Sequence, residues 1–262
     1  MKCLTKLAVK FLAGVLALSV MTGACFAGVV SVNDLKGAKV GVQSGSASEF
    51  LVRELLGENT EGLSVYDRVS ELAAALKAGK IDAAVMDEAP ARFFVMNDDA
   101  LKILPEALAS EYYAAAFRKG DPLRDEFSKI IEEMKADGTL AGIIAKYLDG
   151  EPDPENIDMN RGAEGGKLWV GCAASFPPYG MRTDRGFSGI DIEICAHAAK
   201  KLNKELVIAD YRFEILPYAL AEGKIDMICS ALTITEEREK VMDFSVPYDA
   251  NQEVIVVLSG SK

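Results

Sequence analysis

Short apolar runs alternate with amphipathic segments along most of the chain. Runs such as "AKVGV" and "KIDAAVM" are β-rich, whereas "ASEFLVRELLG" and "DRVSELAAALKAG" place apolar residues at helical spacing. The same alternation returns in "KLWVGC", "DIEICAHAAKKL", "KELVIADYRF" and "KIDMICSAL". This order predicts an α/β fold in which mainly parallel sheets are flanked by helices.

The run "GKID" occurs twice, at Gly79 to Asp82 and at Gly223 to Asp226, each time between a helical pattern and an apolar run. We expect each glycine to end a helix in the left-handed conformation, with the isoleucine leading into a buried strand. Similar units precede the two copies, which predicts two similar lobes. Open α/β sheets bind ligands at the carboxyl ends of their strands, so the residues after each copy are candidate site residues.

Two helices and a linker are predicted between these units. The stretch "DPLRDEFSKIIEEMKADGTLAGIIAKYLDG" reads as two helices, with Asp121 at the start of the first and Gly138 at its end. The Pro-, Gly- and acid-rich residues 149–166 lack apolar periodicity and read as a linker. We therefore expect a lobe at residues 29–110, a crossing with two helices at 111–150, a linker at 151–166 and a second lobe at 167–262.

The first 27 residues have the pattern of a secretory signal, with three lysines, an apolar run from Phe11 to Met21 and small residues before Ala27. We expect a soluble exported protein in the periplasm or another extracytoplasmic space. Cys25 offers an alternative, a lipid anchor, but Thr22 stands where such a site wants an aliphatic residue.

Composition narrows the classes of partner. The formal net charge is −11, and removal of the three signal lysines would make it −14, which argues against nucleic acid and anionic lipid. Cys172, Cys195 and Cys229 remain after the signal, an odd number that argues against a disulfide framework. With His197 as the single histidine and no paired His/Cys spacing, we expect no metal, no cofactor and no catalytic residue.

Candidate binding residues follow the second "GKID". Ser230 and Thr233 offer hydroxyl groups, and Arg238 lies in the first turn of a short helix that Thr235 can cap. A guanidinium beside free helix-start N–H groups suits a carboxylate. The alternative is an ordinary helix cap with a surface arginine.

Other candidates come from two further stretches. Asp87 ends an apolar strand and can neutralise an ammonium group, or it can simply cap the helix before Pro90. The N–H groups of Gly45, Ser46 and Ala47 open a helix and predict an anion site.

Aromatic residues at the predicted strand ends are the last candidates. Phe176, Tyr179 and Phe213 can line a side-chain pocket or form part of the core.

These segments together resemble the family 3 extracellular solute-binding proteins, the polar amino-acid receptors of ABC importers. The resemblance rests on "FPPYGMRTDRGFSGIDIEI", "GKIDMICSALTITEEREKVMDFSVPY", "LKGAKVGVQSGSASEF", "GKIDAAVMDEA" and "KADGTLAGIIAKY". It implies a two-lobed periplasmic-binding-protein fold of type II with a hinge between the lobes.

The resemblance also implies roles for single residues. Arg238 and Thr233, with the backbone N–H of Ser46 or Ala47, would hold the α-carboxylate of the ligand. Its α-ammonium would be held by Asp87 and Ser230, and its side chain would lie between Phe176 and Phe213. Ala173 stands where members that bind cationic or amide side chains often have Asp, which implies a less polar side chain.

The order of the segments departs from the family. The "KLWVG" half, which comes first in relatives, ends this chain, so the chain resembles a circular permutant. This hypothesis predicts that residues 29–32 lie close to residues 258–260. It also predicts a single chain crossing between the lobes, near residues 111–116.

We therefore expect a monomeric protein that captures an L-amino acid between its lobes and delivers it to the membrane permease of an ABC importer. One alternative is an exported dehydratase or lyase similar to cyclohexadienyl dehydratase, with Glu88 or Glu214 as its acid. Another is an amino-acid sensor.

Overall fold

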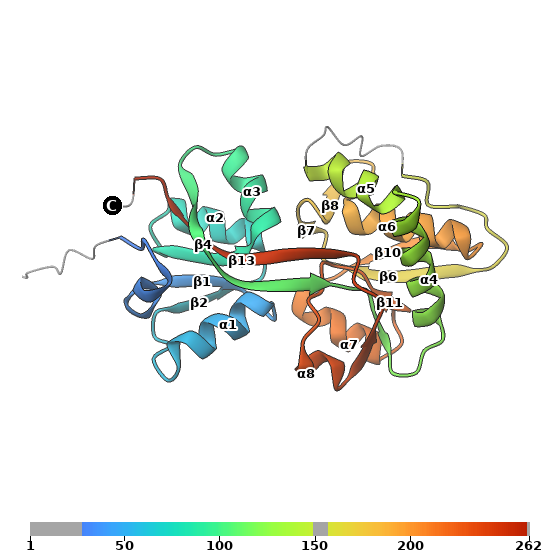
Figure 1. Cartoon of the computed structure of the whole chain (residues 1–262), viewed down its shortest axis with the longest axis horizontal. Coiled ribbons are helices and arrows are strands. Elements are labelled where there is room, and N and C mark those ends of the chain that lie inside the picture. Colours follow the sequence, from blue (N-terminus) through green and yellow to red (C-terminus); the bar gives the residue numbers. More distant parts are fainter. Residues whose placement is uncertain (1–27, 149–156, 261–262) are drawn as a thin grey trace, which may run out of the picture.

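The computed structural model describes residues 28–148 and 157–260 and arranges their strands in two five-stranded sheets and one three-stranded sheet (Figure 1). The predicted signal segment and the first part of the predicted linker lie outside these residues. Within the described ranges, no helix combines the length and the apolarity needed to cross a bilayer.

The first sheet has the strand order β2-β1-β3-β13-β4. Its strands are β1 (Val40–Gln43), β2 (Leu63–Tyr66), β3 (Ala83–Asp87), β4 (Leu101–Tyr113) and β13 (Asp249–Leu258). Strands β1 to β3 are parallel, whereas β13 runs antiparallel to both of its neighbours. The associated helices are η1 (Val32–Gly37), α1 (Ala47–Leu56), α2 (Val69–Lys77) and α3 (Glu88–Met96).

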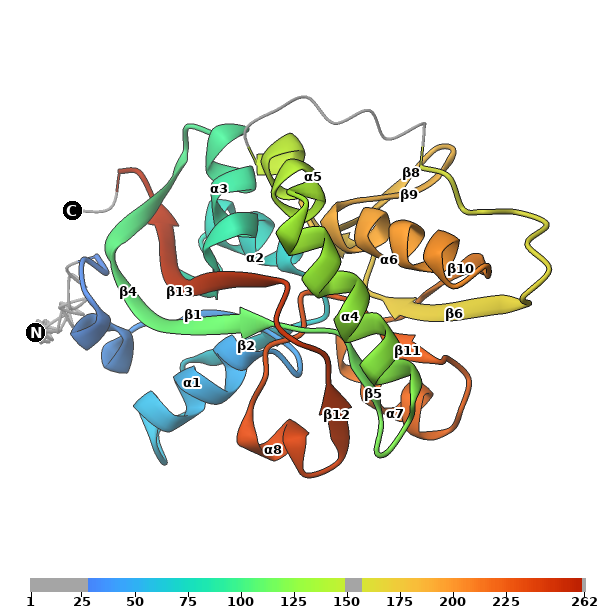
Figure 2. The same ribbon diagram turned by 45° about the vertical axis from the view of Figure 1, so that its right-hand side comes forward.

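The side chains of β3 alternate between the two faces of the first sheet, and different helices cover each face. Ala83 and Val85 pack in one hydrophobic cluster with Val52 of α1, whereas Ala84 and Met86 pack with α2 on the other face. Figure 2 shows α1 on one side of the sheet and α2 and α3 on the other. Asp87 continues the alternation of Ala83 and Val85, so its side chain belongs to the α1 face.

The second sheet has the order β10-β6-β11-β5-β12. Its strands are β5 (Ala116–Arg118), β6 (Lys167–Cys172), β10 (Glu205–Asp210), β11 (Met227–Ile228) and β12 (Met242–Phe244). Its helices are α4 (Leu123–Ala136), α5 (Thr139–Leu148), α6 (Ile190–Lys201), η2 (Phe213–Ile215), α7 (Leu216–Ala221) and α8 (Glu236–Glu239). A small sheet of β7 (Ser175–Phe176), β8 (Gly180–Thr183) and β9 (Gly186–Ser188) adjoins α6.

We call the elements on the first sheet the first half and those on the second sheet the second half. The chain crosses between the halves twice, from β4 to β5 and from β12 to β13 (Figure 1). The expectation of one crossing, and of a lobe that includes all of residues 167–262, was wrong for residues 249–258. Their apolar run at Val254 to Val257 is buried on both faces and completes the first sheet between β3 and β4.

The two "GKID" corners have matching geometry. Gly79 and Gly223 have φ of 64° and 69°, which confirms the predicted left-handed conformation. Ile81 and Ile225 are buried beside glycines of the neighbouring strands, where an added Cβ at Gly41 would come within 2.5 Å of the Ile81 side chain. Each half is therefore built on the same helix-to-strand corner.

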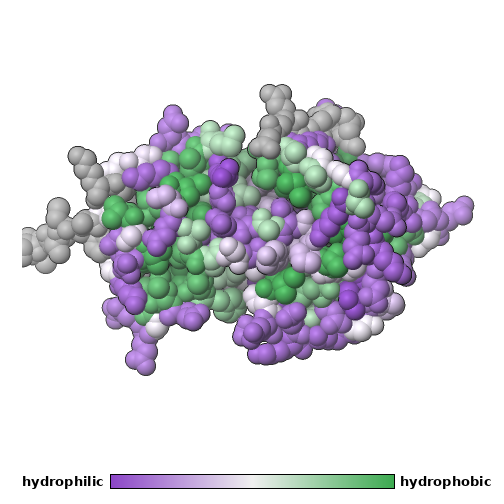
Figure 3. All heavy atoms as spheres, in the orientation of Figure 1, coloured by the Kyte–Doolittle hydropathy of each residue, from purple (hydrophilic) through white to green (hydrophobic). Residues whose placement is uncertain are grey.

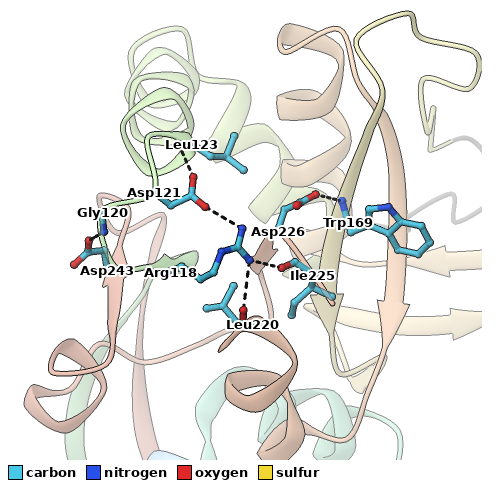
Figure 4. Close-up of polar contacts among 9 residues, drawn as sticks. All are labelled: Arg118, Gly120, Asp121, Leu123, Trp169, Leu220, Ile225, Asp226 and Asp243. Carbon is cyan, nitrogen blue, oxygen red and sulfur yellow. Dashed lines mark hydrogen bonds and ion pairs between the residues drawn. The ribbon is translucent and has the colours of Figure 1, made fainter. Parts of the chain in front are cut away.

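Arg118 joins the second corner to the start of α4 (Figure 4). Its guanidinium donates to the carbonyl of Ile225 at 2.7 Å and pairs with Asp121 at 3.0 Å, and Asp121 in turn accepts from the N–H of Leu123. This contact helps to fix α4 on the second half.

Helix α4 and three cysteines contribute further buried side chains to the core of the second half. The stripe of Phe127, Ile130, Ile131 and Met134 on α4 is buried, and Cys172, Cys195 and Cys229 are buried free thiols. On the face shown in Figure 3, hydrophilic residues cover the outer edge of the second half, whereas apolar residues gather over the first half.

Candidate functional site

Three carboxylates meet on the α1 face of the first sheet: Asp87, Glu111 and Glu253. Glu253 on β13 lies directly opposite Asp87 on β3, and Glu111 on β4 lies opposite Asn251, two residues before Glu253. One oxygen from each carboxylate lies within 4.8 Å of the others. All three side chains are buried, with exposed fractions of 7% for Asp87, 5% for Glu111 and 2% for Glu253.

Each carboxylate accepts a hydrogen bond from a hydroxyl group. Tyr113 donates to Asp87 at 2.6 Å, Ser48 donates to Glu253 Oε2 at 2.6 Å, and Thr233 donates to Glu111. Glu253 Oε1 is buried and has no hydrogen-bond partner among the described residues. The cluster thus retains an unused acceptor.

Burial and mutual repulsion raise the pKa values of two of these acids. Burial, followed by the charge of Asp87, raises the pKa of Glu111 to about 11. The same two causes raise the pKa of Glu253 well above its ordinary value, although the Ser48 hydroxyl opposes them. Glu111 therefore holds a proton near pH 7, which reduces the negative charge of the cluster.

Arg238 faces this cluster from the second half. Its guanidinium donates to the carbonyl of Thr233 at 2.6 Å and, across the halves, to the carbonyl of Gly45 at 3.0 Å. Burial lowers the pKa of Arg238 to about 10, opposed by the charges of Glu111, Asp87 and Glu253. The side chain therefore stays cationic near pH 7 and is held between carbonyl groups that a ligand carboxylate can replace.

Phe213 supports Arg238. The guanidinium carbon lies 5.7 Å from the ring centroid, within the range of a cation–π contact. Phe213 packs in one hydrophobic cluster with Ala173, whereas Phe176 packs in another and lies 6.1 Å from Tyr179. The structure thus assigns the two predicted walls of the side-chain pocket to different clusters.

Ser46 and Ala47 open α1 beside Arg238. The Ser46 hydroxyl accepts from the N–H of Glu49 and so caps the helix. The N–H of Gly45 donates to the Glu49 carboxylate at 2.8 Å, and that of Ser46 donates to the carbonyl of Gln43. Two of the three amides predicted to bind an anion are thus hydrogen-bonded within the protein.

Ser230 lies on the second half, after β11. Its hydroxyl accepts from the N–H of Ala173 at 3.0 Å, and both side chains are buried. This contact ties two of the predicted residues to each other, and it belongs to the second half rather than to the carboxylate cluster.

The two acids considered for catalysis both have ion-pair partners. Glu88 pairs with Arg92 at 2.6 Å and lines a pocket of about 650 Å³ between the halves, together with Tyr179. Glu214 pairs with Arg212 at 3.2 Å through Oε1, while its buried Oε2 has no partner among the described residues.

Glu111, Glu253, Tyr113 and Ser48 were not predicted. Glu111 and Tyr113 lie on β4 and Glu253 lies on β13, away from both "GKID" corners, whereas Ser48 follows the predicted Ser46 and Ala47 on α1. An acid between apolar residues, as in "NQEVIVV", was the available signal, since a buried strand rarely carries an unpaired carboxylate.

Residues 168–262 match the model of bacterial extracellular solute-binding proteins, family 3. That range includes Arg238, Thr233, Ser230 and Glu253.

Individual relatives match over part of their length. The chain is 36% identical over 127 residues to the arginine-binding extracellular protein ArtP of Bacillus subtilis, which covers 47% of this chain and 50% of the relative. It is 29% identical over 91 residues to cyclohexadienyl dehydratase of Pseudomonas aeruginosa, covering 34% of each chain. The chain thus spans about half or less of the length of these relatives.

A solved structure shows a similar partial match. The arginine-bound form of domain 1 from TmArgBP is 38% identical, with 36% of this chain and 81% of that chain covered and a TM-score of 0.31.

Proposed function

We propose that this chain is an extracytoplasmic binding protein of the family 3 type that captures an L-amino acid between its two halves. The observation that carries the proposal is that the half-buried Arg238 on the second half faces the buried Asp87 and its neighbours on the first half. A zwitterion needs a cation for its carboxylate and an anion for its ammonium group, and this arrangement supplies one on each side.

The ligand would be held by groups from both halves. Its carboxylate would replace the carbonyls of Gly45 and Thr233 at the Arg238 guanidinium, with Thr233, Ser46 and Ala47 nearby. Its ammonium would bind Asp87, with Ser230 on the opposite side, and Phe176, Phe213 and Ala173 would face its side chain. Binding of one ligand by both halves favours the closed arrangement.

Delivery to a membrane permease of an ABC importer follows from the same proposal. The N-terminal pattern supports export, and the match of residues 168–262 to extracellular solute-binding proteins agrees with it. Arginine is a first ligand to test because the relative ArtP is an arginine-binding protein.

We also propose that the chain is a circular permutant with a type II periplasmic-binding-protein fold. Val29 and Val257 pack in the same hydrophobic cluster, and the N–H of Val32 donates to Glu106 on β4. Both ends of the described chain therefore lie together on the first half, which supports the permuted order.

A thermal-shift screen of the twenty L-amino acids, followed by calorimetry, tests the binding function. We expect at least one amino acid to stabilise the protein, and Arg238→Met to weaken its binding by about 100-fold or more because a charged hydrogen-bonded pair is lost. Arg182→Met, at an arginine of the same half whose side chain is 64% exposed, is the matched control. An unchanged dissociation constant in Arg238→Met would remove this residue from the site.

Product analysis during the same titrations separates the binding protein from the dehydratase. The unpartnered, buried Oε2 of Glu214 is the observation that favours the enzyme. An amino acid recovered unchanged after prolonged incubation supports a binding protein, whereas its loss, prevented by Glu214→Gln, would support the enzyme.

A further inference from the structure

We propose that Glu111 and Glu253 complete, with Asp87, a three-carboxylate site that binds the ammonium group of the ligand. The inference deepens the proposed function and rests on it for the class of ligand. It adds two residues that the family resemblance does not assign.

The unused acceptor on Glu253 is the first observation. Its side chain is 2% exposed, its Oε2 already accepts from Ser48, and its Oε1 has no partner among the described residues. A buried carboxylate oxygen without a donor is costly, so this atom points to a donor that arrives from outside the chain.

The spacing of the three carboxylates fits an ammonium group. An ammonium has three N–H donors in tetrahedral directions and no acceptor. Three oxygens, each about 2.9 Å from such a nitrogen, lie about 4.7 Å apart. One oxygen of each carboxylate lies no more than 4.8 Å from the others, so this arrangement stays within the observed limit.

The charge of the cluster also fits a cation. In the free protein, burial and the charge of Asp87 favour the neutral forms of Glu111 and Glu253. A bound cation favours the charged forms, so ligand binding should release protons. The groups that face Glu111 are the acids Asp87 on β3 and Glu253 on β13, with Tyr113 on β4 and Arg238 on α8.

A divalent metal ion fits the surroundings less well. Arg238 lies close enough to all three carboxylates for their charges to interact, and its positive charge repels a divalent ion about twice as strongly as a monovalent ammonium at the same place. Hydroxyl groups of Ser48, Tyr113 and Thr233 already occupy lone pairs that a six- to eight-coordinate ion would need.

The test compares Glu111→Gln and Glu253→Gln with the wild type and with Glu106→Gln, an exposed acid on the same strand as Glu111. The probes are the amino acid with the largest thermal shift in the screen of twenty, and putrescine, a diamine without a carboxylate. We expect both site variants to weaken amino-acid binding by about tenfold or more, and Glu106→Gln to leave it unchanged.

Proton release supplies a readout that needs no variant. Calorimetry of the wild type at one pH in phosphate and in Tris should give different binding enthalpies, because protons released on binding are taken up by the buffer. Equal enthalpies in the two buffers, or unchanged affinity in both glutamine variants, would overturn the three-carboxylate site while amino-acid binding still stands. Tighter binding in Glu111→Gln would also overturn it, because Glu111 would then occupy the place of the ligand.

The remaining outcomes separate this site from the proposed function. Stabilisation by putrescine that depends on Glu253, with no response to any amino acid, would keep the site and refute the amino-acid receptor. Stabilisation by MgCl₂ or CaCl₂ in place of any amine would assign the cluster to a metal ion, and no response to any probe would refute both proposals.

Discussion

Glu111 should make the stability of the free protein depend on pH. Its pKa is about 11 in the folded chain and 4.5 for the free side chain, so between these values the folded state holds a proton that the unfolded state has lost. The stabilisation is present in full below pH 4.5 and decreases as the pH rises towards 11, by at most about 1.4 kcal/mol per pH unit.

Glu111→Gln removes this titration, so its free energy of unfolding should fall less steeply with pH. The free energy of unfolding of the variant, relative to that of the wild type, should therefore be higher at pH 9 than at pH 5. Urea unfolding at intervals between pH 5 and pH 9 measures the two slopes, and parallel slopes would show that Glu111 is ionised in the folded protein.

Single residues differ in how far the sequence could identify them. Asp87 ends the strand that follows the first "GKID" run, and Arg238 lies in the short helix after the second, so local patterns identified both. Glu111 and Glu253 are adjacent to Asp87 only because β13 inserts between β3 and β4. Pairing between strands from distant parts of the chain leaves no local signature, so the cluster was missed although each of its residues is visible in the sequence.

At the scale of elements, the corner glycines are open to a direct test. Gly79→Ala and Gly223→Ala should each destabilise the protein by about 1 kcal/mol, because both residues have left-handed φ and an added Cβ would meet no neighbour. Thermal unfolding with calorimetry measures the change.

Gly142→Ala is the matched control for these substitutions. Gly142 lies inside α5, where an added Cβ also meets nothing within 4 Å, so alanine should stabilise by about 0.5–1 kcal/mol. The opposite signs at corner and helix positions are the expected pattern, and stabilisation at Gly79 would contradict the left-handed corner.

The elements themselves were largely predictable because each carries a local pattern. The period of apolar residues identified α1, α2, α4 and α6, and the short β-rich runs identified β1, β3, β6 and β10. The sequence indicates less clearly which of the two sheets a strand joins. The run at Val254 to Val257 indicates a buried strand equally well in either half, and only the open position between β3 and β4 decides it.

For the whole molecule, restoring the usual order of the halves tests the permutation. A variant chain would start at Ile157, join Leu258 to Val29 through a short Gly/Ser linker and end at Leu148. We expect it to fold, to melt within a few degrees of the original and to bind the same amino acid, because Val29 and Val257 already share one hydrophobic cluster.

The rearranged chain should be made with linkers of two lengths. If neither version folds, the result would count against a circular permutation. Circular dichroism and the thermal-shift screen supply both readouts. Amino-acid binding by the original chain would remain a separate result.

Both described ends of the chain lie on the first half, and this has a mechanical consequence. The second half is inserted between β4 and β13. The chain therefore leaves the first sheet from one strand and returns to it in the neighbouring strand. A force applied between the two ends is therefore carried by the first half alone. The second half bears no load until β13 separates from its neighbours, and in a pulling experiment rupture of the first sheet should precede extension of the second.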